Sequence, residues 1–109
     1  MSHKVYNKLV RDKIPEIIKT DGAKPVTRIL NDKEYLDALI EKLKEEIAEF
    51  IEDFSAEELA DIQEVIYALG DAIGKTHREL EIIRTSKADK NGIFRDRIYL
   101  ERVEGLVDK

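Results

Sequence analysis

The sequence predicts an all-α protein, a helical bundle built around a central antiparallel helix hairpin, and three observations support this fold class. Apolar residues recur at helical spacing through residues 36–54 and again through residues 59–73. Three positions combine a capping side chain with a glutamate three residues later, which is a typical helix start. Only two or three residues around Phe54 and Ser55 separate the two apolar patterns, so the two helices should fold back on each other.

The first two helices follow from local signals. Residues 6–22 are expected to form an irregular arm and then a short helix, with Pro15 in the first turn and Gly22 at the end. The first long helix begins at Asn31, whose side chain can cap it, and Glu34 completes the capping pattern.

The remaining elements are expected in the second half of the chain. A second long helix begins after Ser55 and stops near Gly74, and a third begins after Thr76 and runs towards Ala88. Residues 90–92 read as a turn.

Two segments have an ambiguous pattern. Residues 26–30 could be extended, and residues 93–103 could form either a short C-terminal strand, centred on residues 97–100, or an ordered arm. The chain of 109 residues fits a single domain, with an expected ordered core over about residues 6–101.

Composition excludes several classes of protein. Apolar residues make up 42% of the chain, which is too many for wholesale disorder. There is no cysteine, so disulfides, thiolate–metal sites and cysteine nucleophiles are excluded. The apolar runs are far shorter than a membrane span, and the first residues lack the apolar core of a signal peptide. We therefore expect no membrane association and a cytoplasmic location.

Charge is unevenly distributed along the chain. The net charge is −5, but residues 32–64 carry 13 acids against three lysines, a local net charge of −10. Residues 1–31 hold seven bases and three acids, and residues 75–102 hold eight bases and five acids. An acidic centre between mildly basic segments is more typical of a cation-binding site than of a nucleic-acid surface, so no nucleic-acid partner is expected.

Four acidic residues can converge if the long helices form a hairpin. Glu46 and Glu49 are three residues apart, as are Glu58 and Asp61, so each pair shares a helix face. Reflection of the sequence about position 54 places the two pairs opposite each other. Glu58 falls within the apolar stripe of its helix, Glu46 and Asp61 at stripe edges, and Glu49 farther round.

A bound cation would compensate the cost of placing these carboxylates at the edge of a core. All-oxygen ligands favour a hard cation, Mg²⁺ with Mn²⁺ as a possible substitute. The same residues are also consistent with a solvated acidic helix face, in which Glu58 only caps its helix. The spacing alone leaves both interpretations open.

The sequence also resembles a known family. It is similar to the MazG-like, all-alpha nucleoside triphosphate pyrophosphohydrolases, and in particular to a stand-alone house-cleaning branch of them. The segments that carry the resemblance are Glu45-Glu46-Ile47-Ala48-Glu49, Glu58-Leu59-Ala60-Asp61, the opening Tyr6-Asn7-Lys8-Leu9-Val10-Arg11-Asp12-Lys13-Ile14-Pro15, and the closing Asn91-Gly92-Ile93-Phe94 with Arg97-Ile98-Tyr99-Leu100.

This resemblance implies a reaction and a set of ligands. Water would attack a nucleoside triphosphate and release pyrophosphate and a nucleoside monophosphate, which suits nucleotide-pool house-cleaning. The implied Mg²⁺ ligands are Glu46, Glu49, Glu58 and Asp61, and Glu45 would have a weaker, water-orienting role. The resemblance further implies self-association into a homodimer or homotetramer.

A triphosphate needs cationic contacts besides the metal. The candidates in the basic segments are Lys8, Arg11, Lys13, Lys87, Arg95 and Arg97. The main alternative function is a non-enzymatic helical interaction or regulatory module whose acidic face binds a cation or a basic partner. A second alternative, a related enzyme acting on phosphoribosyl-ATP, is disfavoured by the N-terminal segment.

Overall fold

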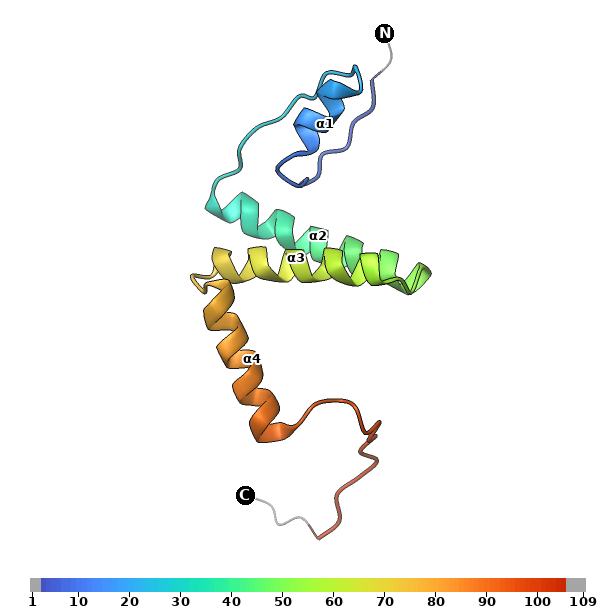
Figure 1. The fold of residues 1–109 in the computed structure, drawn as a ribbon, viewed down its shortest axis with the longest axis vertical. Helices are drawn as coiled ribbons and strands as arrows, with labels where there is room; N and C mark the ends of the chain where they lie inside the picture. The colour runs from blue at the N-terminus through green and yellow to red at the C-terminus, as the bar shows by residue number, and fades with distance from the viewer. Residues whose placement is uncertain (1–2, 106–109) are drawn as a thin grey trace.

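The structure, a computed structural model, describes residues 3–105 and contains four helices joined by short and irregular segments (Figure 1). Within residues 3–105 there is no β-strand, so the all-α prediction is confirmed. None of the helices in this part of the chain is both long enough and apolar enough to cross a membrane.

The first helix, α1 (Ile14–Thr20), is short and has the expected ends. Pro15 lies in its first turn, where the missing backbone N–H removes no helical hydrogen bond. Gly22 follows the helix with φ +91°, a conformation that glycine adopts without strain. This helix packs against none of the other three.

The long helix α2 (Asp32–Glu52) begins with the predicted capping box. The backbone N–H of Glu34 donates to Asn31 Oδ1 at 2.9 Å, and the backbone N–H of Asn31 donates to Glu34 Oε1 at 3.2 Å. Two N–H groups that the helix leaves without partners are thereby satisfied.

Helix α3 (Ala56–Ala72) returns alongside α2 after a connection of only Asp53–Ser55 (Figure 1). Ser55 accepts a hydrogen bond from the backbone N–H of Glu58 at 3.3 Å, as predicted from its capping position. The contact between the two helices buries Leu39 on α2 and Val65 on α3, which are only 2% and 8% exposed. These two helices form the main packed unit of the chain.

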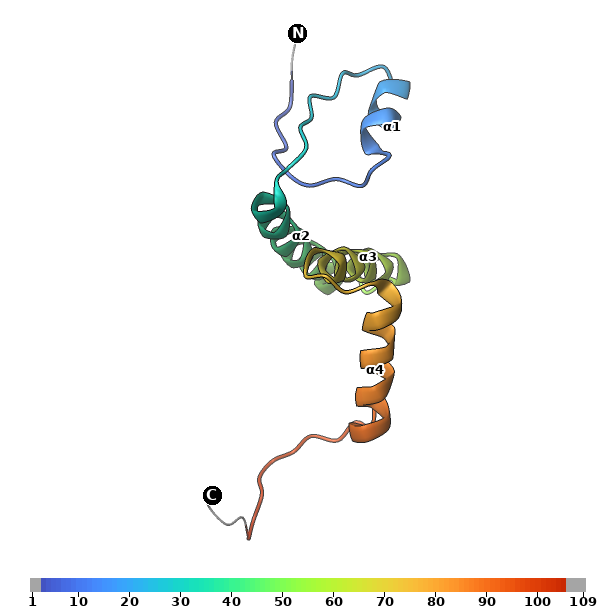
Figure 2. The same cartoon turned by 90° about the vertical axis from the view of Figure 1, so that its left-hand side faces the viewer.

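The last helix, α4 (His77–Asn91), leaves the pair at a steep angle (Figures 1 and 2). Thr76 and Glu79 form its capping box, as expected. The rings of Tyr67 and His77 lie 3.6 Å apart between centroids, and this contact joins α3 to the start of α4.

The end of α4 corrects one prediction. The helix continues three residues past the expected Ala88, through residues that the sequence predicted as a turn. Helical hydrogen bonding extends until Gly92, which has φ +85° and donates its N–H to the carbonyl of Ala88 at 2.8 Å. The glycine therefore marks the true end of the helix.

The C-terminal segment forms an arm, one of the two alternatives that the sequence left open. Residues 93–105 contain no strand, and their side chains are exposed. A strand needs a neighbouring strand to satisfy its backbone, and this segment runs free of the helices (Figure 1). Residues 26–30 likewise form no strand.

The chain as a whole is extended. Its principal extents are 69 × 31 × 25 Å and its radius of gyration is 19.5 Å. A compact domain of this length would have a radius of gyration of about 13 Å. Within residues 3–105, only α2 and α3 pack along their length, so this part of one chain does not form the predicted helical bundle by itself.

Candidate metal centre

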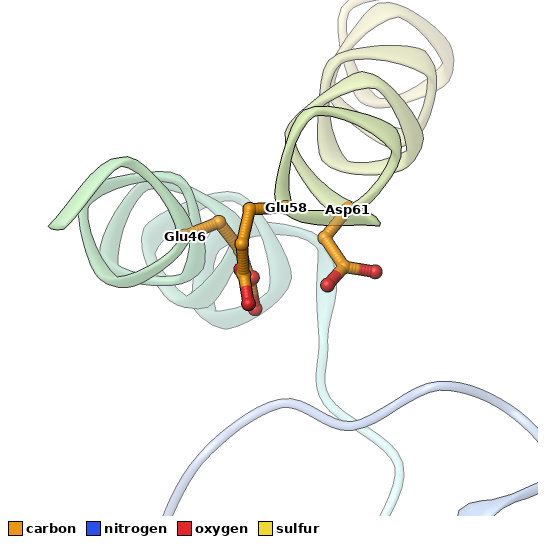
Figure 3. A group of neighbouring side chains, drawn as sticks. All are labelled: Glu46, Glu58 and Asp61. Carbon is orange, nitrogen blue, oxygen red and sulfur yellow. The ribbon is translucent and has the colours of Figure 1, made fainter. Parts of the chain in front are cut away.

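Three carboxylates meet where α2 and α3 face each other. Glu46 comes from α2, and Glu58 and Asp61 from the first turns of α3; each offers one oxygen, and these oxygens lie within 4.8 Å of one another. The three side chains project to the same side of the helix pair, towards the N-terminal segment (Figure 3). We call these three residues the carboxylate cluster.

Glu46 is the most unusual member of the carboxylate cluster because it is only 6% exposed. One carboxylate oxygen, Oε1, accepts from Lys42 Nζ at 3.2 Å, while Oε2 is buried and has no hydrogen-bond partner. Burial raises the pKa of Glu46 above its ordinary value, and the nearby charges of Glu49 and Asp61 raise it further; Lys42 opposes the shift. A buried acid with an unpartnered oxygen is costly unless a cation completes its coordination.

Glu58 is half-buried and has a related environment. Loss of hydration raises its pKa, and the charges of Glu49, Asp61 and Glu46 add to that shift. Its Oε2 atom is also buried without a hydrogen-bond partner. In α2 and α4, the side chains of Glu34 and Glu79 accept a hydrogen bond from the backbone N–H of the capping residue. The side chain of Glu58 makes no such hydrogen bond to Ser55. Its carboxylate instead points into the carboxylate cluster (Figure 3).

The other two predicted acids lie at the margin of the cluster. Glu49 is exposed and contributes no oxygen to the group of three, although its charge acts on both Glu46 and Glu58. Glu45 is bound by cations, with its Oε1 atom 3.2 Å from Lys8 Nζ and 3.5 Å from Lys42 Nζ. Partial burial acts in the opposite direction, but these two lysines lower the pKa of Glu45. Glu45 is therefore a charge-paired neighbour of the cluster.

The N-terminal segment contacts the site through two of its predicted cations. Arg11 Nη2 lies 2.7 Å from Asp61 Oδ1, and Lys8 pairs with Glu45 as described above. Lys13 is exposed at the position that precedes α1. The segment thus crosses the side of the helix pair to which the cluster points (Figure 3).

The remaining predicted cations lie elsewhere. Lys87 is exposed on α4, and Arg95 and Arg97 are exposed in the segment that follows it. That part of the chain extends to the opposite side of the helix pair from the N-terminal segment (Figures 1 and 2). Within one chain, the structure does not bring these three residues to the carboxylate cluster.

Lys42 is a site residue that the sequence analysis missed. Its ammonium group bridges Glu45 and Glu46, and its side chain is only 18% exposed. The signal was present, because Lys42 precedes Glu46 by four residues and such pairs are neighbours on a helix surface. The spacing indicates the contact between Lys42 and Glu46, but it does not indicate how little of either side chain is exposed.

The donor set suits a hard divalent cation. Three carboxylates from two rigid helices supply oxygen ligands only, which Mg²⁺ and Mn²⁺ prefer. The unpartnered oxygens of Glu46 and Glu58 are the observation that favours an ion over a solvated acidic face.

Comparison with known proteins gives a partial match. The chain is 58% identical over 41 residues to an uncharacterized protein of Mycolicibacterium smegmatis (strain ATCC 700084 / mc(2)155). The match covers 38% of this chain and 42% of that protein's length. No family model matches the chain, and no solved structure matches it.

Proposed function

We propose that this protein is a metal-dependent nucleoside triphosphate pyrophosphohydrolase whose site is the carboxylate cluster. The observation that carries the proposal is the buried Glu46 carboxylate, which faces Glu58 and Asp61 and retains an unpartnered oxygen. We propose Mg²⁺ as the ion, with Mn²⁺ as a possible substitute, held by Glu46, Glu58 and Asp61. Glu49 would join them by a change of rotamer.

The proposed reaction needs positioning and charge neutralisation more than a protein nucleophile. A water oxygen forms a bond to phosphorus, a phosphoanhydride P–O bond breaks, and pyrophosphate leaves from the nucleoside monophosphate. A bound divalent ion would neutralise charge on the phosphates and lower the pKa of the attacking water. Glu45, which pairs with Lys8 and Lys42, would orient a water at the margin of the cluster.

The N-terminal cations would contribute to substrate binding. Arg11 and Lys8 already lie against the acidic residues of the site, so both can reach a triphosphate that enters there. Arginine binds phosphate through two parallel N–H groups, which favours Arg11 as the principal contact. In this proposal, the helices α2 and α3 form a hairpin that completes its bundle by homodimer or homotetramer formation.

The decisive experiment measures pyrophosphate release from a panel of ordinary and modified nucleoside triphosphates, with Mg²⁺, with Mn²⁺ and with EDTA. Wild type is compared with Glu58→Gln and with Glu57→Gln, a matched control because Glu57 is exposed on the adjacent position of α3. We expect metal-dependent release that Glu58→Gln reduces by about 100-fold or more and that Glu57→Gln leaves intact.

A second candidate function is a non-enzymatic cation-binding module, favoured by the ion pairs that already surround the cluster. Mn²⁺ binding, measured by electron paramagnetic resonance together with pyrophosphate release, distinguishes this module from the enzyme. Mn²⁺ binding that Glu58→Gln abolishes, without release of pyrophosphate from any nucleotide, would establish the module and exclude the enzyme. Release that persists unchanged in Glu58→Gln would exclude the cluster as the active site.

A further inference from the structure

Helix α2 carries three lysines that each pair with an acidic residue of the same helix, but their side chains differ in exposure. The pairs of Lys33 and Lys44 lie on the surface, with lysine side chains that are 87% and 69% exposed. The Lys42 side chain is only 18% exposed, and its ammonium group contacts both Glu45 and Glu46. Lysine is seldom removed from water unless its charge is paired, so the burial of Lys42 indicates a role beyond that of a surface ion pair.

Lys42 makes the two oxygens of the Glu46 carboxylate unequal. Oε1 lies 3.2 Å from Lys42 Nζ, whereas Oε2 is buried and has no hydrogen-bond partner. The two residues are four positions apart on one helix, so a rigid backbone sets the distance between them. The ammonium group therefore holds one oxygen and leaves the other, Oε2, to a ligand that carries positive charge.

The Glu46 carboxylate has neighbours on both helices. Lys42 contacts it from α2, whereas Glu58 and Asp61 belong to α3. The three carboxylates of the cluster point to the same side of the helix pair (Figure 3), where their like charges repel one another. Lys42 offsets part of this repulsion through its contacts to acids of α2.

We infer that Lys42 is a positioning residue of the metal centre, which holds Oε1 of Glu46 so that Oε2 is presented to the ion. This inference rests on the carboxylate cluster that we propose as the active site. Removal of a group that orients a ligating carboxylate typically weakens metal binding by about 10- to 100-fold. If Lys42 were only a competing cation, its removal would strengthen metal binding. The direction of the change therefore distinguishes the two roles.

The test measures Mn²⁺ affinity of the full chain by electron paramagnetic resonance, without nucleotide. Lys42→Met keeps a long apolar side chain but removes the ammonium group, and it should weaken Mn²⁺ binding by about tenfold or more. Lys42→Arg, which retains a cation at the same helical spacing, should recover most of this loss. Lys44→Met is the matched control, because it removes the same charge at an exposed position and should leave the affinity unchanged. Mn²⁺ binding by Lys42→Met that equals or exceeds wild-type binding would overturn the inference.

A second background identifies the acid through which Lys42 acts. In Glu45→Gln, the substitution Lys42→Met should weaken Mn²⁺ binding by the same factor, because Glu46 is still present. A loss that disappears in the Glu45→Gln background would assign the effect to Glu45 and overturn the role of Glu46 in this inference.

Lys42→Gln covers the case in which Lys42→Met fails to fold, as judged by circular dichroism. Glutamine is neutral, shorter than lysine and a good helix former, so this variant should keep its helices and bind Mn²⁺ more weakly than wild type. Unchanged Mn²⁺ binding by a folded Lys42→Gln variant would also overturn the positioning role.

Pyrophosphate release, measured on the same variants, separates this inference from the proposed enzyme. Mn²⁺ binding that falls in Lys42→Met but not in Lys44→Met, without release from any nucleotide by wild type, supports the positioning role and rejects the pyrophosphohydrolase. Unchanged Mn²⁺ binding in Lys42→Met, together with metal-dependent release by wild type, does the reverse. A wild-type chain that binds no Mn²⁺ would reject both.

Discussion

At the scale of single residues, the raised pKa of Glu46 has a consequence for stability. A carboxyl whose pKa is higher in the folded than in the unfolded chain favours the fold when it is protonated. Its contribution is fully present below the ordinary glutamate pKa of about 4.3 and is lost as pH rises through the raised folded value. Above that value, the buried charge destabilises the metal-free protein.

We therefore predict that Glu46→Gln stabilises the protein at pH 7 in EDTA. The amide removes the buried charge and its repulsion by Asp61, so Tm should rise by about 5 °C, the effect of roughly 1 kcal/mol in a chain of this size. The gain should shrink as pH is lowered towards 4, where wild-type Glu46 becomes protonated. Thermal melts in EDTA between pH 4 and pH 7 test this change in Tm, with the exposed Glu52→Gln as control.

Addition of Mg²⁺ should make the wild-type protein more stable than Glu46→Gln. The ion stabilises the wild-type fold by binding it, whereas Glu46→Gln has lost a ligand. A Glu46→Gln variant that is less stable than wild type at pH 7 in EDTA would show that the carboxylate is adequately satisfied by Lys42.

Arg11 gives a prediction about competition. Arg11 and a metal ion would share Asp61, so Arg11→Ala should tighten Mn²⁺ binding to the free protein by about two- to fivefold, the range for an exposed ion pair. The same substitution should weaken nucleotide binding, because a phosphate contact is lost. Titration with Mn²⁺ and measurement of KM test both effects, with the exposed Lys19→Ala as control. Weaker Mn²⁺ binding by Arg11→Ala would contradict the competition.

At the scale of elements, Ser55 links helix formation to the site. It caps α3 in the turn that carries Glu58, so Ser55→Ala should lower the free energy of unfolding by about 1 kcal/mol. Urea denaturation measures this loss. Ser55→Asp, which retains a capping oxygen and favours the positive end of the helix dipole, should restore stability. An unchanged urea midpoint in Ser55→Ala would mean that packing against α2 alone sets this helix start.

The helix boundaries also show which features of the fold local sequence signals can predict. The starts of α2, α3 and α4 were predicted at Asn31, Ser55 and Thr76, and all three residues cap their helices in the structure. Capping depends on groups within three residues of each other, so the sequence contains all the information needed. The end of α4 lies three residues beyond the predicted Ala88, because helical hydrogen bonding continues through residues whose composition is typical of a turn.

At the scale of the whole molecule, the extended shape predicts that folding and association are coupled. If exposed apolar side chains of α2 and α3, such as Ile66, are buried in the proposed homodimer, Tm should rise with protein concentration, by about 3–5 °C for each tenfold increase. Scanning calorimetry over a hundredfold range of concentration tests this. A Tm independent of concentration would mean that the monomer holds its fold without a partner. Ile66→Lys provides the matched concentration-independent control.

By itself, the sequence determined the all-α fold class, the helix starts, and the acids that share a face on each long helix. These properties depend on hydrogen bonds and side-chain spacing within one or two turns. Tertiary structure alone decided that Glu46, at a stripe edge, is buried while Glu58, within its stripe, is only half-buried. It also decided that Lys42 and Arg11 pair with cluster acids and that residues 93–105 form no strand. These outcomes depend on how one helix is rotated against another and on which segments find a neighbour, and no local pattern encodes either.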